Sequence, residues 1–223
     1  MKIPKEDFLK NSALALSEIY DLLAGLPELS LDSLDPGKTA LVIVDMINAF
    51  ARTGPLKSPR VEALVPEVVR VLKLCRQRGV EAVAFADSHS ERSPEFDSYP
   101  VHALAGTQES EVVDEIKEAG GYTLIAKNST NGFLEEGFQK WFSSRPHLEN
   151  FIVVGDCTDI CVQQFALSLK AYSNMKDEHR RVIVPVNAVD TYDLGAHQGD
   201  LTHAMALYNM MGNGVELYSR VKG

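Results

Sequence analysis

The chain has 223 residues, with 22 Lys and Arg against 31 Asp and Glu, a formal net charge of −9. With 45% hydrophobic and 24% charged residues it has the composition of a globular protein whose core needs no cross-links, which excludes disorder, collagen-like repeats and a coiled coil. The acidic balance and the lack of a Lys/Arg cluster argue against nucleic acid or an anionic membrane as the main partner. We therefore expect a small-molecule ligand.

Neither a membrane span nor a secretory leader is expected from the apolar runs. The longest, residues 40–44 and 82–86, fall far short of the roughly 20 residues that cross a bilayer. The first residues are charged where a signal peptide needs its apolar stretch. The three cysteines, Cys75, Cys157 and Cys161, are an odd number in a chain too large to need disulfides, so we expect free thiols and a cytoplasmic location.

The first predicted element is a helix over residues 8–23, where apolar side chains recur at three- and four-residue steps. The segment LDSLDPGK at residues 31–38 then interrupts the pattern with Pro and Gly. We expect an N-terminal helical extension over residues 1–37, which caps the protein or helps to build a homo-oligomer, and one main domain over residues 38–223. The helical stripe consists of Leu9, Ala13, Leu16, Tyr20 and Leu23.

In the main domain, short runs rich in Val, Ile and Phe alternate with helical patterns. This alternation predicts an α/β fold, a three-layer sandwich in which helices cover both faces of a parallel sheet of six strands. Ligands of such sheets bind beyond the carboxyl ends of the strands. The expected strands are residues 39–44, 80–86, 122–126, 151–154, 182–186 and 214–217, and the expected helices are residues 61–78, 109–119, 134–142, 159–172 and 199–211.

Chemically reactive side chains follow each of the first four expected strands. Asp45, Asp87 and Lys127 end three of them, and Cys161 comes six residues after the glycine that ends the fourth run, Gly155. Successive members are about 40 residues apart, roughly one strand–helix–strand unit. All four side chains are therefore expected to meet in one pocket.

Cys161 is the candidate nucleophile. It lies in the first turn of an expected helix that Thr158 or Asp159 caps, where the helix dipole and free N–H groups favour the thiolate. The alternative is a small buried side chain without chemistry, because free cysteines are among the most buried residues. Cys157 and Cys161 are also spaced like half of a structural zinc site, but the sequence has no second such pair.

Asp45 and Lys127 allow two interpretations. An acid or a lysine at the end of a buried strand is costly unless it is paired or functional. The two side chains form either a buried ion pair or, together with the Cys161 thiol, a catalytic triad in which the acid accepts the thiol proton and the ammonium holds the thiolate.

The segment at residues 86–107 is a candidate metal site. It contains Asp87 and His89, two residues apart at a strand end, followed by Glu95 and His102. Two imidazoles and two carboxylates suit one divalent ion such as Zn, Mn or Fe. The alternative is that these are simply solvated loop residues.

Taken together, VDMINAF, ADSH with SYPVHALAGT, IAKNSTNGF and GDCTDICV resemble the isochorismatase-like cysteine hydrolases, most closely the nicotinamidases, over about residues 38–219. The resemblance implies a six-stranded parallel sheet with flanking helices and a catalytic triad of Asp45, Lys127 and Cys161. It also implies a cis peptide at Asp156–Cys157 that directs the backbone N–H groups of Cys157 and Cys161 into an oxyanion hole.

The same resemblance implies a metal site, which distinguishes nicotinamidases from other cysteine hydrolases of the superfamily. Asp87, His89 and His102 match its ligands, and Glu95 stands where many members have His. Phe50 matches an aromatic residue that packs on the pyridine ring, and Tyr99 stands where many members have Trp.

The implied activity is metal-containing amide hydrolysis that converts nicotinamide to nicotinate and ammonia through a cysteine thioester, for NAD salvage. Two alternatives stay open. One is a metal-independent cysteine amidohydrolase acting on another small amide, such as a ureido or N-carbamoyl compound. The other is a non-catalytic domain that binds a small molecule.

Overall fold

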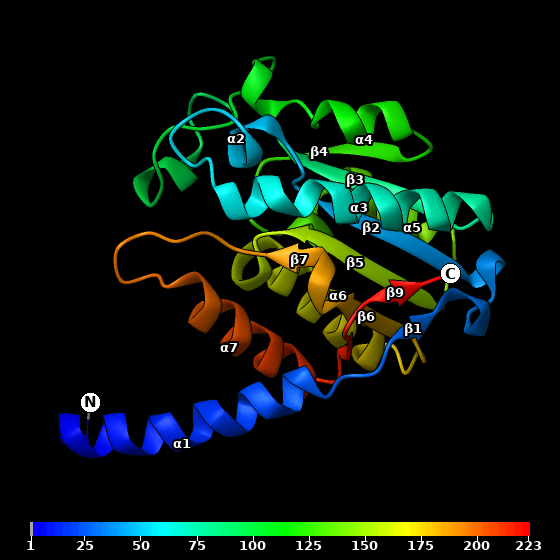
Figure 1. Cartoon of the computed structure of the whole chain (residues 1–223). Coiled ribbons are helices and arrows are strands. Elements are labelled where there is room, and N and C mark those ends of the chain that lie inside the picture. Colours follow the sequence, from blue (N-terminus) through cyan, green and yellow to red (C-terminus); the bar gives the residue numbers. More distant parts are fainter. Residues whose placement is uncertain (1) are drawn as a thin grey trace.

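The computed structural model describes residues 2–223 and is built around one twisted parallel sheet (Figure 1). Six strands follow one another across it, and a short strand, β7, adds to the end of the fourth, which makes seven strands in all. In spatial order these are β4 (Thr123–Lys127), β3 (Glu81–Asp87), β2 (Thr39–Val44), β5 (Asn150–Asp156), β6 (Arg181–Pro185) and β8 (Glu216–Tyr218), with β7 (Val189–Asp190) beside β5.

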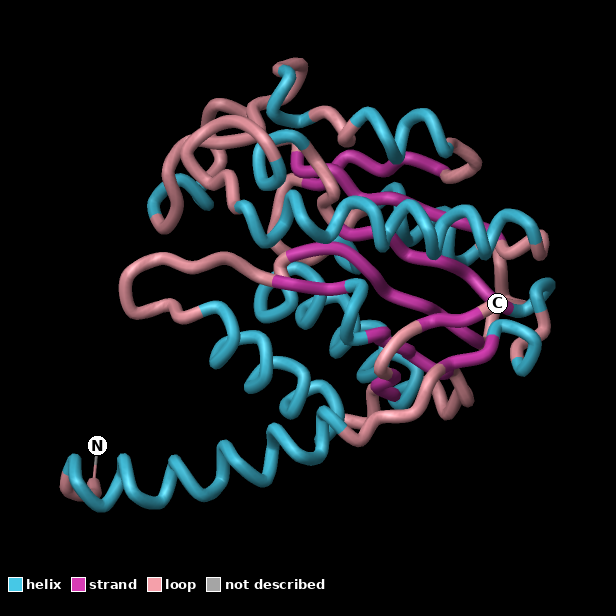
Figure 2. The backbone as a smooth tube through the Cα atoms, viewed as in Figure 1, coloured by secondary structure: helices cyan, strands magenta, loops and turns pink. Residues whose placement is uncertain are grey.

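Helices cover both faces of the sheet, as Figure 2 shows. Alternation along β2 explains the two layers, because Leu41 and Ile43 join one apolar cluster and Val42 joins the other. The first cluster is completed by α2 (Asn48–Ala51), α3 (Pro59–Gln77) and α4 (Asp114–Ala119), and the second by α5 (Glu136–Ser143), α6 (Gln163–Met175) and α7 (Gly199–Gly212).

The predicted three-layer α/β sandwich is confirmed, and the six predicted strands lie within two residues of the observed ones at nearly every end. Two predicted helices begin differently. The one expected from residue 109 starts at Asp114, because Val112 forms an antiparallel bridge with Ile47. The one expected from residue 159 opens with a π-helical turn, Thr158–Val162, before α6.

The N-terminal helix, α1 (Lys5–Ala24), extends away from the body (Figure 1). Only its C-terminal half packs on the protein, where Ile19 is buried and Leu16 and Leu23 are half-buried. The expected stripe is therefore only partly covered, and Tyr20 is 73% exposed. After α1, β1 (Leu29–Ser30) pairs with β9 (Val221–Lys222) in a second small sheet, which holds the segment after α1 against the C-terminal strand. Within residues 2–223, no helix is both long and apolar enough to cross a membrane.

The strand order reverses between β2 and β5, since the chain proceeds to β3 and β4 on one side and to β6 and β8 on the other. The two strands approach closely at their carboxyl ends. Gly155 has a φ of +113°, and a Cβ there would lie 2.0 Å from the Val44 carbonyl oxygen, so only glycine fits. Such a reversal is where sheets of this kind place their ligands.

Candidate active site

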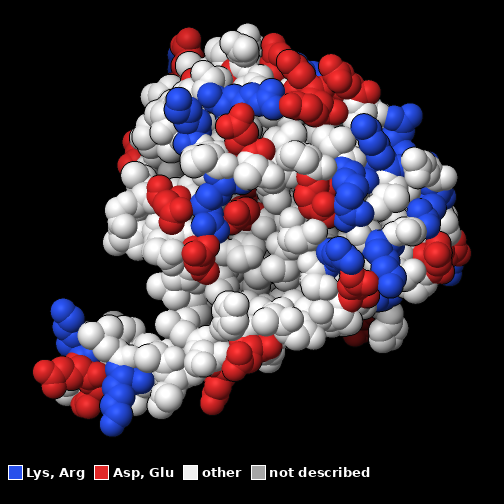
Figure 3. Space-filling view, viewed as in Figure 1, with Lys and Arg blue, Asp and Glu red and all other residues white. Residues whose placement is uncertain are grey.

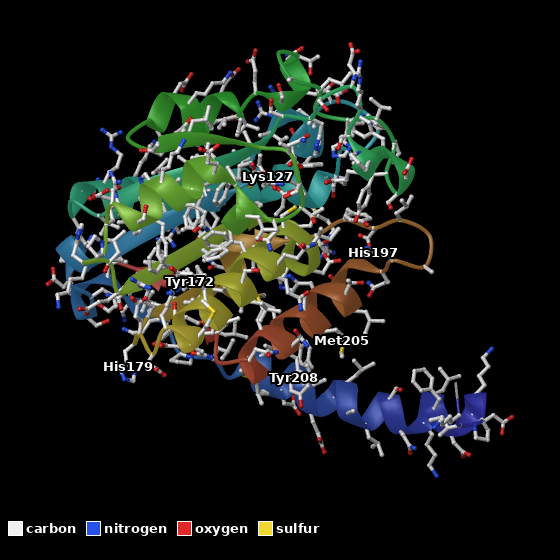
Figure 4. All side chains as sticks on the ribbon, turned by 180° about the vertical axis from the view of Figure 1, so that it is seen from behind. Lys127, Tyr172, His179, His197, Met205 and Tyr208 are labelled. Carbon is white, nitrogen blue, oxygen red and sulfur yellow. The ribbon has the colours of Figure 1, made fainter. Side chains whose placement is uncertain are left out.

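Four reactive side chains meet at the carboxyl edge of the sheet, as the sequence predicted. Lys127 ends β4 directly beside Asp87 at the end of β3, and Asp45 follows β2. The fully buried Lys127 Nζ lies 2.9 Å from Asp45 Oδ2 and 3.7 Å from Cys161 Sγ, and it donates hydrogen bonds to Asp87 Oδ1 and, at 2.7 Å, to the Ser129 carbonyl. One ammonium thus links both carboxylates and the thiol. Figure 4 shows Lys127 near the upper end of the sheet.

The charges in this group determine which carboxyl titrates near neutrality. Burial acts to lower the pKa of Lys127, but the two carboxylates hold it well above its usual value. Burial also opposes ionisation of Asp87, but Lys127 and His89 keep its pKa below the usual value. For Asp45, burial and repulsion from Asp87 outweigh Lys127 and raise the pKa to about 7. Asp45 is therefore the carboxyl that can take up and release a proton at neutral pH.

Cys161 lies within the π-helical turn, and its Sγ is within 4.8 Å of carboxylate oxygens of Asp45 and Asp87. Burial raises the pKa of the thiol well above its usual value, and although Lys127 lowers it, the two carboxylates raise it further. Both effects oppose that of the helix N-terminus, which we expect to favour the thiolate, so a nearby base would assist formation of the thiolate.

The turn before Cys161 contains the cis peptide that the family resemblance implies. The Asp156–Cys157 peptide is cis, which confirms the position inferred from the family resemblance. The Cys157 carbonyl accepts hydrogen bonds from the amides of Ile160 and Val162, and the Cys161 amide between them is not among its donors. Asp156 itself is a buried carboxyl that the sequence analysis did not single out, and burial raises its pKa well above the usual value.

The predicted metal residues also come together. Donor atoms of Asp87, His89, Glu95 and His102 all lie within 4.8 Å of one another. His89 Nε2 is 3.7 Å from Asp87 Oδ1 and 3.8 Å from Glu95 Oε1, and His102 Nε2 is 4.0 Å from the same Glu95 oxygen. Burial and repulsion from Asp87 raise the pKa of Glu95, and a cation between the two carboxylates would relieve this repulsion.

Both imidazoles are oriented for a cation. His89 Nδ1 lies 3.2 Å from Asn128 Oδ1, and His102 Nδ1 lies 2.8 Å from the Pro100 carbonyl oxygen, so each Nδ1 carries a proton to donate. When an imidazole with this Nδ1 proton is neutral, its Nε2 lone pair faces the shared centre. His89 Nε2 is buried and has no hydrogen-bond partner among the described residues. The arrangement of neutral Nε2 donors, outer hydrogen bonds and two carboxylates fits a divalent ion.

A cavity of about 400 Å³ joins the two groups. Its lining includes Asp87, Glu95 and His102 of the candidate metal cluster as well as Cys157 and Cys161. Phe50 and Tyr99 also line it, with their ring centroids 5.6 Å and 6.3 Å from that of His102, while His89, Asp45 and Lys127 are not among its lining residues. The structure thus brings together the full predicted set of site residues.

The sequence analysis missed the loop that follows β7. Tyr192 of this loop lines the cavity, and its ring stacks on His197 with centroids 4.0 Å apart. His197 Nε2 lies 2.9 Å from Asp159 Oδ2 in the π-helical turn that contains Cys161, and Figure 4 shows His197 in this loop. Arg60 of α3 holds the loop by donating to Asp190 Oδ1. The sequence does contain a signal for this loop, because the polar residues DTYD at positions 190–193 directly follow an apolar run, as the other site residues do.

Known proteins share this architecture. Residues 39–215 match the isochorismatase domain. The chain is 30% identical to nicotinamidase 1 of Arabidopsis thaliana, over 81% of this chain and 85% of that protein. Among solved structures, an N-carbamoylsarcosine amidase from Thermoplasma acidophilum aligns with a TM-score of 0.67 and 26% identity, covering 83% of this chain and 99% of that one. A pyrazinamidase of Pyrococcus horikoshii in complex with zinc aligns with a TM-score of 0.67 and 22% identity, covering 81% and 98%.

The domain match spans most of the chain and includes every site residue described above. The Arabidopsis thaliana protein and the Thermoplasma acidophilum protein are both amidases by name. The chain therefore belongs to the isochorismatase family, as an amidase-like hydrolase.

Proposed function

We propose that this protein is a metal-dependent nicotinamidase, which hydrolyses nicotinamide to nicotinate and ammonia and so supplies nicotinate for NAD salvage. The observation that carries the proposal is that one cavity is lined by both groups. Cys161 lines it together with Asp87, Glu95 and His102 of the candidate metal cluster, and Phe50 and Tyr99 line it too. A flat aromatic ring that carries both a ring nitrogen and a carboxamide can meet the metal cluster and the thiol in this one cavity.

The reaction begins with the thiol. Asp45, as the carboxylate, takes the proton from Cys161 Sγ, and the thiolate attacks the carboxamide carbon to form a C–S bond. The amides of Cys157 and Cys161 donate to the resulting oxyanion, which is the largest single stabilisation in acyl transfer of this kind. Lys127 stabilises the thiolate and the Asp45 carboxylate by charge, since its Nζ lies near both.

Ammonia then leaves. Asp45 returns its proton to the amide nitrogen, the C–N bond breaks, and the thioester remains on Cys161. Water, deprotonated by Asp45, attacks the thioester carbon, the C–S bond breaks, and Cys161 regains a proton. The net reaction consumes one water and releases nicotinate and ammonia.

The metal cluster holds the far side of the substrate. When bound, a divalent ion supplies a Lewis acid for the lone pair of the pyridine nitrogen. His89 and His102 present Nε2, and Asp87 and Glu95 offset the charge of the ion. Phe50 and Tyr99 pack on the ring and exclude water from the thiol.

The test is ammonia release from nicotinamide, pyrazinamide, ureidoacrylate and N-carbamoylsarcosine, with protein loaded with Zn, Mn or Fe and with protein stripped by a chelator. We expect nicotinamide or pyrazinamide to be the best substrates and their KM to rise when the metal is removed. Turnover of the ureido or N-carbamoyl compound alone, unaffected by the chelator, would contradict the proposal and favour the metal-independent amidohydrolase.

A further inference from the structure

The N-terminal half of α1 has an apolar stripe with nothing beneath it. Leu16 and Ile19 lie against the body, and the same helical face continues toward the N-terminus as Phe8 and Leu9, one to three turns away. These two side chains are 39% and 54% exposed. The stripe that anchors α1 therefore extends beyond the surface it packs on.

A second apolar stripe faces it from α7. Leu201, Met205 and Tyr208 follow a four- and a three-residue step, so they share one face of the helix, and all three are exposed. Figure 4 shows Met205 and Tyr208 on the side of α7 that faces α1. The space-filling view shows the two elements diverging with open space between them and few charged side chains on the body beside it (Figure 3).

The helix α1 cannot close this space by itself. It is continuous from Lys5 to Ala24, with its proline and glycine, Pro4 and Gly25, only at the flanking positions. Sharp kinks in helices arise almost always at proline, glycine or a bulge, and α1 has none of them inside. Because Ile19 fixes the C-terminal half, the N-terminal half stays away from α7 of its own chain.

We propose that the occupant is a second copy of this chain, and that two copies dimerise by each laying the Phe8/Leu9 stripe of α1 on the Leu201/Met205/Tyr208 stripe of the partner's α7. Every copy carries both surfaces, so one two-fold axis satisfies both and leaves no open end. The overhanging half, about 11 residues and so roughly 16 Å long, is also too short to be stable as an isolated helix in water.

Charge and area support a protein partner. The α1 helix carries two Lys against four Asp and Glu, a net charge of −2, whereas helices that lie on anionic membranes have a Lys- and Arg-rich polar face. The α7 helix has Asp200 as its single charged residue. Covering the overhang twice would bury roughly 1,200–1,600 Å² in total, the size of a standard stable interface.

The experiment is sedimentation velocity of the full chain at micromolar concentration. We expect twice the chain mass of 24.6 kDa for the wild type. Leu9→Asp and Met205→Lys should each give monomers, and Leu14→Asp, on the opposite face of α1 and 66% exposed, should remain dimeric as the matched control. Far-UV circular dichroism of each variant verifies that the fold is intact.

A mixture of the two variants tests whether α1 of one copy contacts α7 of the other copy. A Leu9→Asp copy and a Met205→Lys copy restore one wild-type contact and place Asp against Lys in the other, so the mixture should dimerise although neither variant does alone. A monomeric wild type, a dimer that survives Leu9→Asp, or a mixture that stays monomeric would overturn the proposal. So would a monomer that co-sediments with phosphatidylcholine–phosphatidylglycerol vesicles, which would assign the stripe to lipid.

Discussion

The carboxyl edge of the sheet and the N-terminal half of α1 both depart from the usual distribution of residues, in opposite ways. The edge buries Asp45, Asp87 and Lys127, whereas the N-terminal half of α1 exposes Phe8 and Leu9. At the edge the charges of Asp45, Asp87 and Lys127 compensate one another inside the chain, because one ammonium contacts both carboxylates. In the N-terminal half of α1, no other described part of the chain covers these two apolar side chains. The difference supports the two proposals made above, a small-molecule site at the edge and a second copy of the chain as the partner of the N-terminal half of α1.

The largest effect is expected from the thiol at the edge. Cys161→Ala should lower turnover by at least about 10⁴-fold, because the attacking atom is lost while the cavity remains. Ammonia release measures turnover, and calorimetry should show that nicotinamide still binds. The matched variant is Cys157→Ala, which should keep substantial activity because its proposed role uses the backbone N–H. Activity retained in Cys161→Ala would exclude it as the nucleophile.

The balance of charge at the edge depends on Lys127, whose ammonium contacts both buried carboxylates. Lys127→Ala leaves two carboxylates buried beside each other, and we expect the free energy of unfolding to fall by about 3–5 kcal/mol, along with loss of activity. The comparison is Lys38→Ala, which removes an exposed pair with Glu149 and should cost less than about 1 kcal/mol. Urea denaturation measures both. Equal effects of the two variants would show that the buried group is not stabilised by Lys127.

The edge was predictable from the sequence because topology alone places its members. Parallel strands end at one edge, so Asp45, Asp87 and Lys127 had to meet once the strands were identified. The contact of Arg60 with Asp190 was not predictable, because it joins α3 to β7 across 130 residues of sequence and no local pattern indicates that pairing. Nor was the raised pKa of Cys161, since burial of the thiol depends on the whole fold.

The candidate metal cluster is the part of the edge where a bound cation would balance the charge of the Asp87 and Glu95 carboxylates. We expect His89→Ala to lower metal occupancy and raise the KM for nicotinamide by about 100-fold, because it removes a neutral buried nitrogen donor. Glu95→Ala should act in the same direction but less, since Asp87 still balances the charge. The fold should survive in both, as measured by thermal unfolding. An unchanged KM in fully metal-free protein would refute the orienting role.

Acidification should affect catalysis through Asp45. Its pKa of about 7 lies above the usual value, so the carboxylate needed to accept the Cys161 proton is lost as the pH falls through 7. We expect kcat/KM to decline about tenfold per pH unit below that point and to level off above it. Stopped ammonia assays from pH 5 to 8 measure this. A flat profile over that range would exclude Asp45 as the proton acceptor.

The smallest effect concerns a residue that acts through another. Asn128 Oδ1 lies 3.2 Å from His89 Nδ1 and also accepts the Ser90 amide at 3.3 Å, which holds the imidazole with Nε2 toward the other ligands. Asn128→Ala should weaken metal affinity by about tenfold, the lower end for outer hydrogen bonds to ligating histidines, because the donor remains but its orientation is no longer fixed. Asn128→Asp should restore the affinity, since a carboxylate also accepts from Nδ1. Competition with a chromogenic chelator measures metal affinity without any substrate, and equal affinity in all three proteins would assign Asn128 to the loop backbone alone.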